Sequence, residues 1–103
     1  MRAEEETPER SPRYESKLGL EDVPIEVGEI DRRWGEYENG IVRLNWRLIL
    51  APVRIQDYVL VHELGHSIHD ERSDSFWNVV GSLIPDYDDR RSWLRINGNT
   101  LTV

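Results

Sequence analysis

Alternation of apolar and polar side chains between residues 23 and 46 predicts a small sheet. The segment VPIEVGEI (23–30) alternates as a half-buried strand does, and IVRLNW (41–46) alternates less regularly. Between them, EYENG (36–40) ends in Asn39-Gly40, a strong hairpin signal because both residues tolerate positive φ. We therefore expect a small antiparallel sheet in which 41–46 is the return strand of a hairpin.

From Pro52 to about His69 the apolar period changes from that of a strand to that of a helix. Leu60, Val61, Leu64 and Ile68 fall on one stripe. At 100° per residue, the histidines at positions 62 and 66 lie roughly 150° from the centre of that stripe. The pattern predicts a helix with a core face and a separate histidine face.

Two shorter amphipathic helices are expected to follow. Ser73 has the character of an N-cap, and Pro85 closes the apolar pattern that begins at Phe76. The last helix begins at Asp86, with acidic residues early and arginines late, and Asn97-Gly98 ends it. The fold class predicted is α+β: a small antiparallel sheet followed by the histidine-bearing helix and two further helices.

The first seventeen residues differ in character from the rest of the chain. They are polar, charged and interrupted by prolines, with Tyr14 as the one large apolar side chain before Leu18. Such a composition is typical of disordered segments. We therefore expect residues 1–17 to be a disordered or loosely held leader and residues 18–103 to form the domain.

Composition narrows the chemistry that the chain can carry. It has 103 residues, no cysteine and a net charge of −7. A metal site would have to use His, Asp or Glu, and direct nucleic-acid binding is not expected without a basic face. No stretch approaches the length of a membrane span, and residues 1–16 contain no apolar signal-peptide region. A cytoplasmic protein with no membrane contact is the expectation.

The strongest chemical signal is His62-Glu63-Leu64-Gly65-His66, an H-E-x-x-H motif within the long helix. Residues i and i+4 project side by side, so His62 and His66 are candidate ligands of one Zn²⁺ ion. Glu63 is the candidate general base, which would take a proton from a zinc-bound water and pass it to the leaving amine. The sequence therefore predicts hydrolysis of a peptide or protein substrate.

Several separate segments resemble the YgjP-like metallopeptidases, relatives of the SprT-like zincins. The segments are RWG (33–35), LNWRLILAP (44–52), DYVLVHELGH (57–66), FW (76–77) and PDYDDRRSWL (85–94). The resemblance implies a zinc-dependent peptidase fold with a sheet over the active-site helix. It also implies the same roles for His62, Glu63 and His66.

The chain departs from that family in three places. Its region before RWG is shorter, and Glu36-Tyr37 replaces a common Ser-Cys. The family's third histidine ligand falls at Arg72, which stays protonated and has no lone pair to donate to a metal. Arg72 either weakens the site or turns outward to pair with Asp70 or Glu71.

The third metal ligand is accordingly left open among three residues. Asp70 and Asp74 are the carboxylates closest in sequence to the missing position. His69 lies about 10.5 Å along the axis from His62, so it could bind the same ion only if the helix unwinds after His66. The rival hypothesis to a working metallopeptidase is a degenerate, inactive member that acts as a protein-interaction module.

Overall fold

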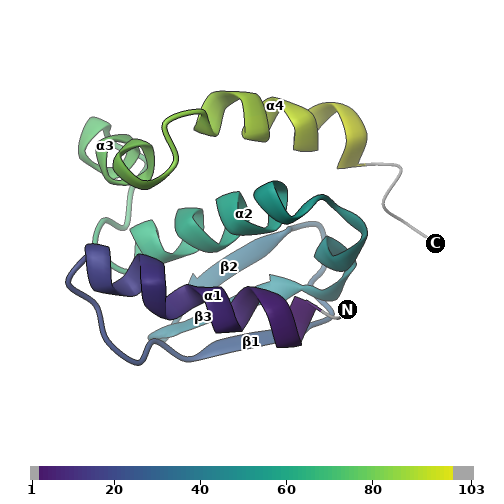
Figure 1. Cartoon of the computed structure of the whole chain (residues 1–103), viewed down its shortest axis with the longest axis horizontal. Helices are drawn as coiled ribbons and strands as arrows, with labels where there is room; N and C mark the ends of the chain where they lie inside the picture. The colour runs from purple at the N-terminus through teal and green to yellow at the C-terminus, as the bar shows by residue number, and fades with distance from the viewer. Residues whose placement is uncertain (1–2, 99–103) are drawn as a thin grey trace.

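The computed structural model describes residues 3–98, which form an α+β domain. One mixed sheet lies under a central helix, and two further helices cover the opposite side of that helix (Figure 1). The elements in chain order are α1 (Ala3–Lys17), β1 (Ile25–Gly28), β2 (Gly35–Glu38), β3 (Ile41–Asn45), the 3-10 helix η1 (Trp46–Leu50), α2 (Val53–His66), α3 (Asp74–Leu83) and α4 (Tyr87–Asn97). Within the described residues, no helix combines the length and hydropathy needed to cross a membrane.

The sheet has the order β1-β3-β2, and one of its two pairings differs from expectation. The β2–β3 hairpin is confirmed, with Asn39 and Gly40 at φ 53° and 78°. The expected antiparallel pairing of the first strand is wrong, because β1 runs parallel to β3. The hairpin occupies one edge of β3, so β1 takes the other edge, and residues 29–34 cross over the end of β3. The Asn45 side chain holds this crossover by donating to the carbonyls of Ile30 and Arg33 at 3.3 and 3.0 Å.

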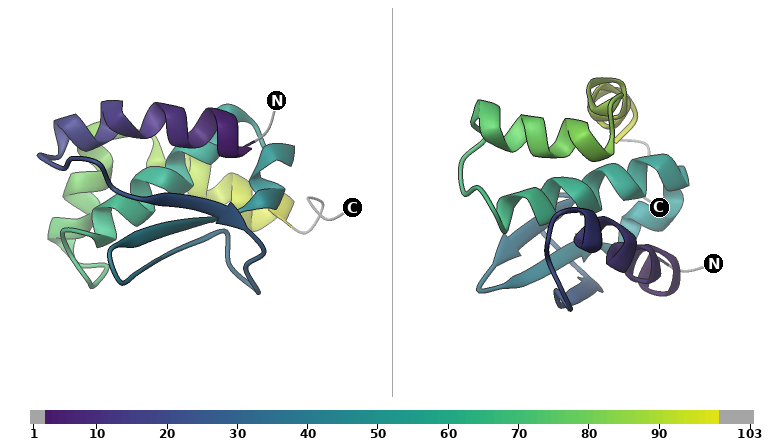
Figure 2. Two further views of the ribbon diagram at one scale, coloured as in Figure 1. Left: turned by 90° about the horizontal axis from the view of Figure 1, so that it is seen from below. Right: turned by 60° about the vertical axis from the view of Figure 1, so that its left-hand side comes forward.

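Helix α2 is the centre of the domain. It packs beside α1 over one face of the sheet, while α3 and α4 cover its other side (Figure 2). Every residue from 55 to 65 is buried. The main core joins α2 to the sheet and to α3 through buried side chains: Val42, Leu44, Leu48, Tyr58, Val59, Leu60, Val61, Leu64, Phe76, Val80 and Ile84. The helix ends at His66 rather than near His69, so the segment that follows can turn back toward the histidine side of α2.

Residues 3–17, which the sequence predicts to be a disordered or loosely held leader, form helix α1. Polar contacts hold the second half of this helix. Arg10 Nε donates to Asp57 at 2.6 Å, and the Tyr14 hydroxyl donates to the other Asp57 oxygen at 2.9 Å. The buried Glu15 accepts from the Ser11 hydroxyl at 2.6 Å and from the Val23 amide at 2.8 Å. The polar composition alone predicts disorder, because Asp57, the partner of Arg10 and Tyr14, lies far along the chain on α2.

The two C-terminal helices are as the sequence predicted. Ser73 caps α3, its hydroxyl accepting from the Phe76 amide at 3.3 Å. Helix α4 starts after Asp86 and ends at Asn97. The predicted α+β class is therefore confirmed, with α1 as an additional helix before the sheet.

Candidate active site

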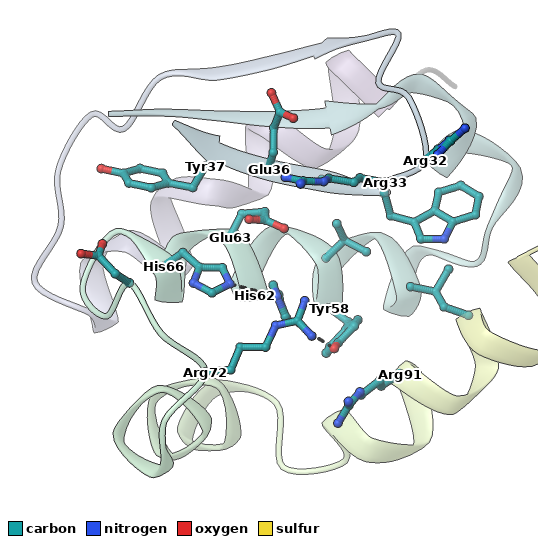
Figure 3. A pocket seen from close by; sticks show the side chains of 15 residues that line it. Arg32, Arg33, Glu36, Tyr37, Tyr58, His62, Glu63, His66, Arg72 and Arg91 are labelled. Atoms are coloured by element: carbon teal, nitrogen blue, oxygen red, sulfur yellow. Dashed lines mark hydrogen bonds between the residues drawn. The ribbon is translucent and has the colours of Figure 1, made fainter. Parts of the chain in front are cut away.

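His62 and His66 point from α2 into the same cleft (Figure 3). Their Nε2 atoms lie 3.2 Å apart. Two nitrogens that bind one tetrahedral zinc ion at 2.0–2.1 Å are separated by about 3.3 Å. The imidazoles of this chain are therefore already spaced as two ligands of a single ion.

The backbone after α2 orients His66. Its Nδ1 lies 3.2 Å from the carbonyl oxygen of His69. Because a carbonyl can only accept, Nδ1 carries the proton and the Nε2 lone pair faces the cleft. On the same helix, the Tyr58 hydroxyl lies 3.5 Å from His62 Nδ1. His69 thus contributes through its backbone, a role that the sequence pattern did not reveal.

Aromatic side chains of α3 pack against both imidazoles. Phe76 is fully buried, stacks on His66 with ring centroids 4.4 Å apart, and meets His62 edge-on at 5.0 Å. Trp77 meets His62 at 5.7 Å. Gly65 allows this packing, since a Cβ there would lie 2.9 Å from the Phe76 ring. The Phe76-Trp77 pair therefore does more than fill the core: it fixes the rotamers of the two histidines.

Glu63 lies beside the histidines on the same helix and is buried. Burial raises the pKa of its carboxyl to about 7, while Arg72 and Arg33 oppose the rise and Glu36 adds to it. Burial, Arg72, His66 and Arg91 together lower the pKa of His62 to about 3. His62 is neutral at pH 7 and can donate its lone pair, and the Glu63 carboxyl titrates where a general base is effective.

Strand β2 passes very close to α2 at the position of Glu63. A Cβ on Gly35 would lie 2.9 Å from Val59 Cγ1 and 3.0 Å from Glu63 Cγ. Any larger residue would displace the strand or the Glu63 side chain. Gly35 belongs to RWG, one of the segments that resemble the YgjP-like family. Its steric role follows only from the fold.

The cleft in front of these residues has a volume of about 680 Å³. Residues 32–37, from the crossover and β2, form one wall. The other residues that line the cleft belong to α2, to the loop after α2 and to α4. Strand β2 is an edge strand, so one wall offers backbone groups that β3 does not use. Such a wall suits an extended peptide, which can add to a sheet edge.

The three candidates for a third ligand are placed differently. Asp70 lines the cleft, whereas Asp74 is exposed in the first turn of α3 and the ring of His69 does not line the cleft. Within the described residues, no set of three His, Cys, Asp or Glu side chains is gathered for a metal. The residues present fit zinc through two nitrogens, and the third ligand stays a prediction.

Arg72 faces the cleft rather than turning outward. Its side chain reaches in front of His62 toward Tyr58 (Figure 3). Among the described residues it forms no ion pair, so the expected alternative of a pair with Asp70 or Glu71 is not found. Its charge contributes to the lowered pKa of His62 and opposes the rise at Glu63.

Comparison with known families identifies the family of this chain. Residues 1–97 match the sequence profile of the YgjP-like metallopeptidase domain. The chain belongs to the YgjP-like metallopeptidase family. The match begins at residue 1 and so takes in α1 together with the sheet and the histidine helix.

A solved structure gives independent support for the fold of this YgjP-like chain. The crystal structure of the metallopeptidase zymogen of Pyrococcus abyssi, abylysin, superposes with a TM-score of 0.77 at 19% sequence identity. The superposition covers 89% of this chain and 92% of abylysin. The likeness establishes a shared fold. Comparison with curated proteins finds no significant match.

Proposed function

We propose that this YgjP-like protein is a zinc-dependent metallopeptidase that hydrolyses peptide bonds, with His62 and His66 as metal ligands and Glu63 as general base. The observation that carries the proposal is the placement of two Nε2 atoms 3.2 Å apart beside a buried carboxylate in one cleft. Family membership supports a metal cofactor, typically zinc.

Each residue of the centre has a defined task. A zinc ion would polarise the scissile carbonyl and acidify a water molecule. Glu63 removes a proton from the attacking water and delivers it to the leaving amine, which a carboxyl of pKa about 7 does well near neutral pH. The edge of β2 would hold the substrate extended across the cleft.

A second candidate function is favoured by Arg72. The guanidinium in front of His62 repels a dication, and the described residues gather only two ligands. A chain that no longer retained zinc would be an inactive family member whose cleft binds protein segments without cleaving them.

Zinc stoichiometry separates these two functions. Equilibrium dialysis of the purified chain should show one Zn²⁺ per molecule, and His62→Ala or His66→Ala should remove it. His69→Ala tests a candidate third ligand: since that ring does not line the cleft, the variant should retain the ion, and a loss of zinc would identify His69 as a ligand. Zinc retained in both ligand variants would place the metal elsewhere, and absence of zinc from the wild type would favour the inactive module.

Chemistry is tested separately from binding with Glu63→Gln. The amide cannot accept the proton, so hydrolysis of an unfolded protein substrate should fall by about 100- to 10,000-fold. Bound zinc should remain at one equivalent. Cleavage at the wild-type rate would show that Glu63 is not the base.

A further inference from the structure

Four arginines line the cleft: Arg32, and three that come from three separate elements. Arg33 belongs to the crossover before β2, Arg72 to the loop between α2 and α3, and Arg91 to α4. Figure 3 shows Arg72 and Arg91 on the α3–α4 side of the histidines and Arg33 on the opposite wall. This gathering of cations contrasts with the net charge of −7 for the chain.

Carboxylates of the protein do not neutralise these three guanidinium groups. Within the described residues, Arg33, Arg72 and Arg91 form no ion pair. Arginines elsewhere do, as in the pairs Arg10–Asp57, Arg43–Glu26, Arg47–Glu29 and Arg90–Asp86. The planar donors of a guanidinium match the two oxygens of a carboxylate, so the cleft offers unused sites for that group.

The α3–α4 wall holds Arg91 in place. Its guanidinium carbon lies 5.1 Å above the centre of the Trp77 ring, and Trp77 in turn stacks on Tyr87 with centroids 5.0 Å apart. A guanidinium on an aromatic face loses little freedom when it binds an anion. Arg72 and Arg91 extend into the cleft from the same side of the histidines (Figure 3).

Asp88 of α4 acts electrostatically on Tyr58 together with Arg72 and Arg91, but within the described residues no acidic side chain forms an ion pair with either arginine. Glu36 lies 3.6 Å from Arg43 and is already engaged by it. Glu63 lies at the base of the cleft on α2, and Asp70 follows the end of that helix. In Figure 3, Arg72 and Arg91 extend from the wall opposite Glu36.

We propose that the cleft selects its peptide ligand by a carboxylate near the scissile bond, which Arg72 and Arg91 bind together. The proposal deepens the proposed function, since it takes the ligand to be a peptide. The carboxylate can be an Asp or Glu side chain or the C-terminus of the peptide. Arg33, on the other wall, gives a second contact for a peptide with more than one acidic residue.

A peptide fits better than a nucleic acid as the source of the anion. A nucleic-acid site needs a continuous basic surface that follows the phosphate backbone. The basic residues here are confined to a cleft in an acidic protein. The net charge of −7 would by itself disfavour an acidic peptide, so any preference for one must come from the local cleft.

The test compares three fluorescein-labelled dodecapeptides by fluorescence anisotropy. The first contains four Glu and is amidated at its C-terminus, the second has Gln at the same positions and is amidated, and the third is the Gln peptide with a free C-terminal carboxylate. Binding to the full-length chain is measured in a chelator, so that no metal can bind a carboxylate and no cleavage occurs. The series is repeated with zinc and Glu63→Gln.

The Glu peptide, or the Gln peptide with a free C-terminus, should bind at least about tenfold tighter than the amidated Gln peptide. Arg72→Gln and Arg91→Gln should each reduce that ratio by about threefold or more, and the double variant should abolish it. Arg95→Gln is the matched control: it removes an exposed arginine of α4 that does not line the cleft. The ratio of the two peptide affinities for Arg95→Gln should stay at the wild-type value. All three positions are changed to glutamine, and circular dichroism verifies the fold of each variant.

The arms of the experiment assign the source of the carboxylate. Preference for the third peptide over the second supports recognition of the chain terminus, and preference for the first supports recognition of a side chain. Equal affinities for all three peptides overturn the proposal, as does a preference that survives the double variant. Tighter binding of a single-stranded RNA oligonucleotide than of the Glu peptide overturns it too. Loss of hydrolysis with the preference intact would refute only the proposed function.

Discussion

Two buried carboxylates on α2, those of Asp57 and Glu63, differ in whether the protein supplies them with hydrogen-bond and ion-pair partners. Asp57, on the α1 side, accepts from Arg10 at 2.6 Å and from Tyr14 at 2.9 Å. Glu63, on the cleft side, has no hydrogen bond or ion pair within the described residues, and burial raises its pKa to about 7. A buried charge that is paired supports the fold, whereas one left without partners costs stability and stays available for proton transfer.

The largest effect expected from this comparison is that of Asp57→Ala on stability. The change removes the acceptor of two long-range hydrogen bonds and breaks the ion pair of the Arg10 side chain, which is 18% exposed. The free energy of unfolding should fall by about 2–4 kcal/mol. Urea unfolding followed by tryptophan fluorescence measures it. A loss below about 1 kcal/mol would mean that α1 is held mainly by its apolar contacts.

Gly35→Ala should disturb the cleft side of α2. The added methyl group would lie 2.9 Å from Val59 Cγ1 and 3.0 Å from Glu63 Cγ, which is closer than van der Waals contact. The free energy of unfolding should therefore fall by about 1–3 kcal/mol. Hydrolysis should fall as well, because Glu63 must move. Gly28→Ala in β1 is the matched control, with no atom within 4 Å of its Cβ, and should change both by little. Equal behaviour of the two variants would contradict the close approach of β2 to Glu63.

Arg72→His is expected to complete the metal site. It exchanges a repelling cation for a neutral imidazole, and zinc should bind more than about tenfold tighter in a titration against a competing chelator. Arg72→Gln separates the two contributions, since it removes the charge without adding a ligand. If wild type and Arg72→His bind zinc equally, then Asp70, Asp74 or His69 already serves as the third ligand.

The smallest effect is expected for Glu63→Gln on the stability of the metal-free chain. Replacing a buried carboxyl that lacks partners with a neutral amide should raise the free energy of unfolding by about 1 kcal/mol. The same urea assay, run beside Asp57→Ala, measures the contrast between the two carboxylates. A loss as large as that of Asp57→Ala would show that Glu63 has a structural role.

The features that local sequence determined are those in which neighbours along the chain interact. Asn39-Gly40 fixed the hairpin, Ser73 fixed the start of α3, and the spacing of His62 and His66 placed both rings on one side of α2. These depend on backbone conformation and helical period, which act over a few residues. The position of both histidines on one side of α2 could therefore be predicted from the sequence.

The tertiary structure decided what depends on residues far apart in sequence. Helix α1 is held by the contact of Arg10 with Asp57, which lies 47 residues further along the chain. Strand β1 pairs in parallel with β3 because the hairpin leaves that edge of β3 open. Gly35 matters only because β2 crosses α2 at Glu63, and Arg72 faces the cleft only because the chain turns back after His66. Propensity and period do not encode such contacts, since they arise from packing after the elements have formed.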